Sequence, residues 1–252
     1  MGKRILVTND DGINGLGLKI LADKLQRLGE VIVVAPDHER STASHSLTLH
    51  KPLRFRTVAK NRYSLSGSPA DCVRFGILHL LRHKLDLVIS GINAGVNLGE
   101  DVVYSGTVAA AVEGSMLDIP AIAVSAQSHV NEKQFGCAAD IALKVARKVL
   151  LYGLPKDVCL NVNVPMAPSK RLRGVKGIKP ACLGHRVYGK KVTIRRDPRG
   201  NAYNWLLADQ VSGIPSKGSD VEAFEDGYAT VTPLKLDWTD KEYIQELDKW
   251  GF

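Results

Sequence analysis

Short continuous runs of Val, Ile and Leu recur along the first half of the chain, separated by segments long enough to form helices. These runs are Ile5–Val7, Val31–Ala35, Leu87–Ile89 and Ile122–Val124. Apolar runs without polar alternation are typical of strands buried on both faces, and helix-length connections join parallel strands. The sequence therefore predicts an α/β fold of the doubly wound class, in which helices cover both faces of a mostly parallel sheet.

Helix-start signals and one hairpin complete the prediction for the first part of the chain. Ser68 and Pro69 form a cap and a first-turn proline, which predict a helix through Leu81. The Ala-rich segment Val108–Met116 predicts another helix. Residues 51–67 contain two extended-looking stretches, and we expect them to form a hairpin.

The pattern changes after about Pro165. Val187–Ile194 and Tyr203–Leu207 alternate in polarity and are separated by the turn sequence DPRGN, so they predict a projecting β-hairpin region. Ala229–Pro233 predicts a strand that returns to the body. Thr239–Trp250 predicts a C-terminal helix capped by its threonine.

The positive charge is concentrated in this second part. The net charge is +8, but Lys170–Arg199 holds eleven Lys or Arg residues and one acid, which gives +10 and leaves −2 for the rest. A basic arm suits anionic ligands, nucleic acid or an acidic partner surface, and charge alone equally fits a solvated arm. We expect residues 1–165 to form an α/β core, and residues 166–252 to carry the arm, a returning strand and the terminal helix.

The N-terminus shows no cleavable targeting pattern, and no apolar stretch approaches the length of a membrane span. The four cysteines are far apart and form no CxxC pair, which argues against a structural zinc site or a disulfide framework. We expect a cytoplasmic protein without a membrane partner.

Two adjacent carboxylates, Asp10 and Asp11, follow the first predicted strand in the sequence TNDDG. Ligands of doubly wound proteins bind at the carboxyl ends of the strands, although Asp-Asp-Gly is also common in turns. Two carboxylates about 4 Å apart repel each other by about 4 kcal/mol at an effective dielectric constant near 20, and a divalent cation reverses this effect. Oxygen ligands favour magnesium, manganese or calcium.

Two further loops bring polar groups to the same edge. The loop APDHERSTASHS after the second strand carries Ser41. The Gly- and Asn-rich loop after the third strand carries Asn93 and Asn97, and ends at Ser105–Thr107 directly before the Ala-rich helix. Backbone N–H groups and the helix dipole at such a start bind phosphate, so we expect an anion site there.

Six sequence blocks, in order over nearly the whole chain, resemble the SurE family. They are NDDG, APD with RS and SHSLTL, GSPADCV, SGINAG with NLGEDVVYSGTVAAAVEG, DPRGN, and GYATVTPL. The resemblance implies a metal-dependent 5′-nucleotidase that hydrolyses nucleoside 5′-monophosphates, with some members also cleaving 3′-nucleotides or short polyphosphate. It also implies one magnesium or manganese ion per subunit, and a homodimer or homotetramer assembled through exchanged C-terminal elements.

The resemblance also implies roles for individual residues. The metal ligands would be Asp10, Asp11, Ser41 and Asn93, and the two aspartates would be catalytic. The phosphate pocket would be lined by Asn9, Asn97, Ser105, Gly106 and Thr107. The chain departs from the family pattern at Thr42, which replaces a glycine, and at Val96, which replaces a proline. Because a β-branched residue tolerates positive φ poorly, the Thr42 backbone is either ordinary or strained.

Other function classes fit the sequence less well. Gly12, Gly15 and Gly17 give GxxGxG instead of the GxGxxG pattern of dinucleotide-binding oxidoreductases. An aspartyl-phosphate phosphatase needs a second acid where Gly12 stands. A nucleic-acid-binding module would use the basic segment but would not require the Asp pair, so we expect no specific nucleic-acid partner. His45, close to Ser41, is a candidate proton donor to a leaving group.

Overall fold

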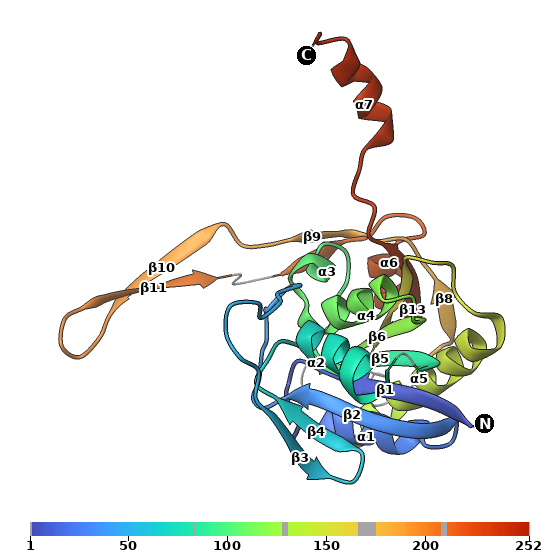
Figure 1. The fold of residues 1–252 in the computed structure, drawn as a ribbon. Helices are drawn as coiled ribbons and strands as arrows, with labels where there is room; N and C mark the ends of the chain where they lie inside the picture. The colour runs from blue at the N-terminus through green and yellow to red at the C-terminus, as the bar shows by residue number, and fades with distance from the viewer. Residues whose placement is uncertain (1, 83, 128–130, 166–174, 208–210, 252) are drawn as a thin grey trace.

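The protein has a central nine-stranded sheet with the strand order β3-β4-β2-β1-β5-β6-β7-β13-β8 (Figure 1). The structure is a computed structural model that describes residues 2–82, 84–127, 131–165, 175–207 and 211–251. In spatial order the strands are β3 (Phe55–Ala59), β4 (Arg62–Leu65), β2 (Gly29–Pro36), β1 (Lys3–Thr8), β5 (Leu87–Ala94), β6 (Ala121–Ala126), β7 (Val158–Val164), β13 (Ala229–Lys235) and β8 (Ile178–Pro180).

The six strands from β4 to β7 run parallel, which confirms the predicted doubly wound α/β class. β3 pairs antiparallel with β4, so residues 51–67 do contain a hairpin, and β4 joins that hairpin to the main sheet. β13 pairs antiparallel with β7 and parallel with β8. The segment predicted to return to the body is therefore a strand of the same sheet.

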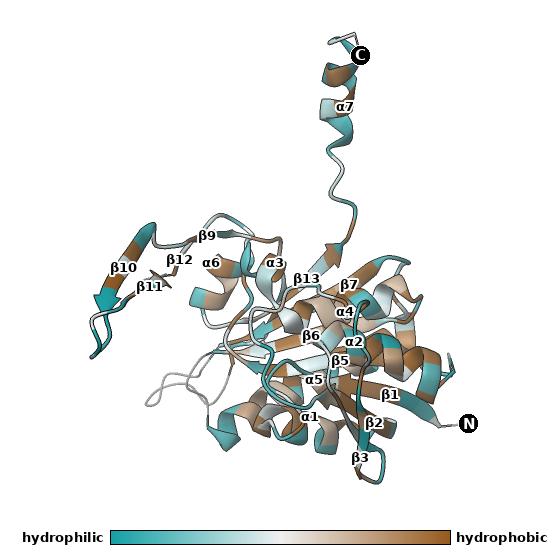
Figure 2. Cartoon of the chain, turned by 60° about the vertical axis from the view of Figure 1, so that its left-hand side comes forward, coloured by the Kyte–Doolittle hydropathy of each residue, from teal (hydrophilic) through white to brown (hydrophobic). Residues whose placement is uncertain are grey.

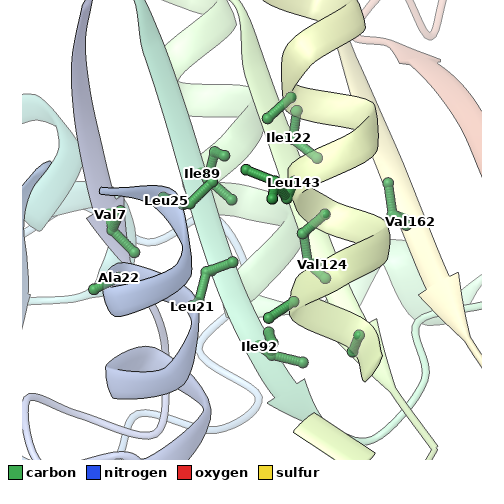
Figure 3. Close-up of a cluster of buried hydrophobic side chains, with 14 of the residues drawn as sticks. Val7, Leu21, Ala22, Leu25, Ile89, Ile92, Ile122, Val124, Leu143 and Val162 are labelled. Atoms are coloured by element: carbon green, nitrogen blue, oxygen red, sulfur yellow. The ribbon is translucent and has the colours of Figure 1, made fainter. Parts of the chain in front are cut away.

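Helices cover both faces of the sheet, with α1 and α5 on one face and α2 and α4 on the other. The helices of the described residues are α1 (Leu16–Leu25), α2 (Pro69–Phe75), α3 (Asp101–Tyr104), α4 (Gly106–Met116), α5 (Glu132–Tyr152), α6 (Asp220–Glu225) and α7 (Lys241–Asp248). Successive side chains of a strand point to opposite faces, and the core divides accordingly. Ile5 and Val7 pack with α1 and α5, whereas Leu6 packs with α2 and α4 on the other face. Figure 3 shows the first of these clusters.

Two predicted helices differ in detail from the structure. The helix capped by Ser68 has a full capping box with Asp71, but after Phe75 it continues as a π-helical turn, η1 (Gly76–Leu80). The prediction that Thr239 caps the C-terminal helix is wrong, because the side chain of Asp240 accepts the first free backbone N–H groups. Aspartate is the stronger cap, and its position moves the helix start by one residue.

Two elements project from the body (Figure 1). The first, called the arm below, comprises residues 185–207 and 211–214. It is built of two antiparallel ribbons, β9 (His185–Val187) with β12 (Ser212–Ile214) and β10 (Lys191–Arg196) with β11 (Ala202–Leu207). The second is α7. The first basic residues of the charged segment, Lys170, Arg171 and Arg173, lie outside the described residues. Among the described helices, none is both long and apolar enough to cross a membrane.

Candidate functional site

The chain turns sharply at the end of β1 and leaves polar side chains at the carboxyl edge of the sheet. Asn9 is fully buried, and its side-chain nitrogen donates to the Gly12 carbonyl at 3.1 Å. Gly12 has φ +93, and a Cβ there would lie 3.0 Å from the backbone carbon of His38. The turn therefore requires glycine both for its conformation and for the close approach of the next loop.

Asp10 lies against the start of α4. The Thr107 hydroxyl donates to the Asp10 carboxylate at 2.6 Å, and both side chains are buried. A Cβ on Gly106 would lie 3.1 Å from the Cβ of Asp10 and 3.3 Å from its Oδ2, so a larger residue would push the carboxylate away. The end of β1 and the predicted anion loop, about 95 residues apart in sequence, thus meet at one point.

Burial changes the acidity of both aspartates. Removal from water raises the pKa of Asp10, and hydrogen bonds from Thr107 partly oppose this. The pKa of Asp11 is raised to about 6, first by burial and then by the charges of Asp10 and Glu39. In both carboxyls the protein disfavours the charged form, an effect that a nearby cation would reverse.

The start of α4 has the form of an anion-binding site. Ser105 is the N-cap, and its hydroxyl accepts from the Val108 backbone N–H at 3.1 Å. The helix begins at Gly106, two residues before the predicted start, so its first turn includes Thr107. The positive end of an eleven-residue helix therefore points to the edge that holds Asp10.

The loop after β2 passes over the same edge. The Arg40 backbone N–H donates to the Asp10 carbonyl at 2.7 Å, which places Ser41 next to this strand end. Ser41 is exposed, and its hydroxyl donates to Glu39 at 2.6 Å. Thr42 has φ +56, so of the two alternatives for this position the strained backbone is the one observed.

The two asparagines of the third loop have different surroundings. Asn93 lies near the end of β5, and its amide nitrogen donates to the Gly95 carbonyl at 2.8 Å, so its oxygen is the atom suited to a cation. Asn97 is buried, and its side-chain nitrogen donates to the Ser125 hydroxyl at 2.7 Å. Its role in a phosphate pocket stays a prediction, because this amide is held by an interior network.

Sequence reasoning missed this network. Asn161 and Asn163 on β7 both donate their side-chain amides to the Asn97 carbonyl, at 2.7 and 3.0 Å, and Asn163 also accepts the Asn97 N–H at 2.7 Å. The network fixes the loop between Asn93 and the anion site. The signal in the sequence was two asparagines at alternate positions of the apolar run VCLNVNV.

His45 lies on the loop after β2, and its ring is held by a buried acid. Nε2 lies 2.8 Å from Glu113 Oε2, and the Glu113 side chain is 1% exposed. Glu113 also forms an ion pair with Arg74 at 2.6 Å. These contacts fasten the loop to α4, and the role of His45 as a proton donor stays a prediction.

The oxygen atoms of this edge fit a hard divalent cation. Asn9 Oδ1 is buried without a hydrogen-bond partner within the described parts of the chain, which suits a ligand. Asp10, Asp11, Asn93 and Ser41 supply further carboxylate, amide and hydroxyl oxygens. Among the described residues no three His, Cys, Asp or Glu side chains form a cluster, so a cation here would also need neutral oxygens, as magnesium and calcium accept.

Comparison with known proteins identifies the family. The model described as "Survival protein SurE" matches residues 5–190. The chain belongs to the SurE family. It is 44% identical to "5'-nucleotidase SurE" from Geotalea daltonii, with 98% of each chain covered, and 45% identical to "5'-nucleotidase SurE" from Pelobacter propionicus, with 98% of this chain and 99% of the relative covered.

A solved structure of the SurE protein from Aquifex aeolicus has the same fold. The TM-score is 0.83 at 39% sequence identity, with 98% of this chain and 99% of that chain covered. The residues proposed for the site fall within the part that the SurE family model matches. The outer ribbon of the arm and α7 lie beyond it, in the part shared with these full-length relatives.

Proposed function

We propose that this chain is a metal-dependent 5′-nucleotidase, which hydrolyses nucleoside 5′-monophosphates to nucleoside and phosphate. The observation that carries the proposal is the 2.6 Å hydrogen bond from Thr107 to Asp10, since it joins a buried carboxylate to an anion-binding helix start. Membership of the SurE family and relatives named 5′-nucleotidase over their full length support the same activity.

Asp10, Asp11 and Asn93 would hold one magnesium or manganese ion per subunit, with Ser41 as a further ligand. When bound, such an ion neutralises charge on the phosphoryl group and makes a bound water more acidic. Asp10 is fixed by Thr107, whereas Asp11 is less buried. Asp11 is therefore the better placed of the two to accept a proton from the attacking water.

The backbone N–H groups of Gly106 and Thr107 would bind the phosphoryl oxygens, and the α4 dipole would stabilise their charge in the transition state. Ser105 keeps these groups in position because its hydroxyl caps the helix. Asn9 and Asn97 complete the proposed pocket from the ends of β1 and the third loop. All residues of this proposed phosphate pocket lie within residues 1–165, the proposed catalytic core.

Residues 166–252 would assemble the subunits into a dimer or tetramer. Val192 pairs with Leu206 across the outer ribbon of the arm, so both lie on one face with Ile194. These side chains are 55%, 87% and 69% exposed. Figure 2 shows apolar segments on both projecting elements. A two-stranded ribbon with an exposed apolar face is marginal alone, and a second copy of this chain would cover it.

The activity is tested with a panel of nucleoside monophosphates, short polyphosphate and sugar phosphates, assayed before and after metal removal with EDTA. We expect release of phosphate from nucleoside 5′-monophosphates, loss of turnover in EDTA, and recovery with magnesium or manganese. Activity that persists after thorough metal stripping would contradict the metal assignment. Absence of phosphate release with every metal and substrate would contradict the function.

A further inference from the structure

An exposed tyrosine adjoins the proposed phosphate site. Tyr104 is the last residue of α3 and directly precedes Ser105, the cap of α4. Its side chain is 56% exposed. Its carbonyl accepts the Ser44 backbone N–H at 3.2 Å, and Ser44 belongs to the loop that carries Ser41. Tyr104 therefore lies where the two loops that carry proposed site residues meet.

The Tyr104 ring is held in place by the base of the arm. It packs edge-on against Tyr188, with ring centroids 5.9 Å apart and an angle of 84° between the planes. The Tyr188 hydroxyl donates to Asp101, on the first turn of α3. Asp101 also accepts Arg186 Nε at 3.0 Å, and both side chains of this pair are largely buried. Tyr104 is thus held on one side by its own helix α3 and on the other by Tyr188, directly after β9.

We propose that Tyr104 stacks against the base of the nucleotide and so makes the site selective for nucleoside monophosphates over sugar phosphates that lack a base. This inference rests on the proposed function. An edge-on contact with Tyr188 occupies only part of the ring and leaves the rest accessible. In a nucleotide whose phosphate binds at Gly106, the ribose and the base would extend from the phosphate toward solvent. The exposed Tyr104 ring lies on that side of the site, two residues before Gly106.

The position of Tyr104 separates it from the exposed tryptophans. Trp205 lies on the arm, and Trp238 and Trp250 flank α7, so all three belong to the projecting elements. Tyr104 lies on the body, beside the anion site. Stacking of a base on an aromatic side chain accepts any base, since every base has a π face. The enzyme should therefore prefer substrates with a base over substrates without one, and should distinguish less strongly between different bases.

The test compares AMP with ribose 5-phosphate in the metal-loaded enzyme and in three variants. In Tyr104→Ala we expect KM for AMP to rise about 10-fold, the usual effect of losing one base stack, with kcat little changed. Kinetics with ribose 5-phosphate should stay the same. Tyr104→Phe keeps the ring and should retain the wild-type preference. Tyr104→Leu keeps bulk without a π face and carries the test if the alanine variant does not fold.

Tyr152→Ala is the matched control. Tyr152 is 76% exposed at the end of α5, a helix that runs back to the opposite edge of the sheet, so both substrates should be unaffected. An equal loss with AMP and ribose 5-phosphate in Tyr104→Ala would overturn the proposal, and so would unchanged AMP kinetics. A smaller assembly by light scattering would also overturn it, because Tyr104 would then be a subunit contact. Wild-type enzyme that cleaves neither substrate would instead refute the proposed function.

Discussion

The carboxyl edge of the sheet and the arm depart from the usual distribution of side chains in opposite ways. At the edge, Asp10 is 4% exposed and Thr107 is fully buried. On the arm, Ile194 and Leu206 are largely exposed. Polar groups buried together are held by hydrogen bonds and are sensitive to small changes, whereas exposed apolar groups need a second surface. The first region is organised within one chain, and the second is the surface for which we propose a second subunit as the partner.

The largest effect is expected from substitutions at the edge. Asp10→Asn and Asp11→Asn keep the size of the side chain but remove a charge that would bind the cation. Each should lower kcat by about 10² or more, which corresponds to about 3 kcal/mol of barrier. Steady-state assays of AMP hydrolysis measure this. Asp23→Asn, an exposed position on α1, is the control and should be neutral. If both site variants hydrolysed AMP at the wild-type rate in saturating manganese, the active site would not lie at this edge of the sheet.

A second prediction sharpens the contrast at the arm. Replacing Lys191–Leu207 with a short Gly/Ser linker removes the exposed apolar face but leaves Tyr188 and the body intact. We expect a smaller species in light scattering and an unchanged stabilisation of the body by manganese in thermal melts. The double variant Ile194→Ser and Leu206→Ser should act in the same direction with less disturbance. If both variants formed an assembly of the wild-type mass, the arm would not contribute to subunit contacts.

A third prediction concerns pH and the stability of the metal-free chain. The pKa of Asp11 is raised from 3.8 to about 6, so the folded state binds more protons than the unfolded state between these values. The free energy of unfolding of the metal-free protein should therefore fall as the pH rises through this range. In EDTA, Asp11→Asn should melt about 2–4 °C higher than wild type above pH about 6, roughly 1 kcal/mol after allowance for its partial exposure. The two proteins should converge at pH about 4, and parallel curves would contradict the burial of this carboxyl.

The smallest effect is expected from the charge of the arm. Lys190 and Lys191 are exposed and precede or begin β10. Reversing both charges should lower cleavage of short polyphosphate about 3-fold and affect AMP less, because only the longer anion reaches a distant basic surface. Added salt should reduce the difference between wild type and variant. An equal effect on the two substrates would show that the arm acts through structure instead of charge.

 The sequence predicted the body of the fold because its strands are continuous apolar runs. Ile5–Val7 in β1 and Leu87–Ile89 in β5 are such runs, and these central strands could be recognised without knowledge of their partners. The meeting of Asp10 with the start of α4 also follows from the sequence, since the carboxyl ends of neighbouring parallel strands share one edge.

The remainder depends on contacts between distant segments that no local pattern specifies. The sheet extends beyond β7 because β13 pairs with it across more than 60 residues, and β8 then pairs with β13. The Gly- and Asn-rich sequence around Asn97 gives no sign of burial, yet Asn161 and Asn163 hold this residue in the interior. The link from Asp101 to Tyr188 likewise joins residues 87 apart. Such pairings are determined by tertiary packing, which local propensity does not encode.

The position of β13 has a consequence for the order in which the protein folds during synthesis. Every proposed site residue precedes residue 165, so this part leaves the ribosome first and domains form in that direction. β7 pairs with β13, which is made only after the arm. Until residue 235 has emerged, β7 is an open edge of the sheet, and open edges are templates for unwanted strand pairing. The nascent chain therefore carries the polar carboxyl edge with the proposed site and an unpaired β7 edge at the same time. Synthesis of β13 covers the β7 edge.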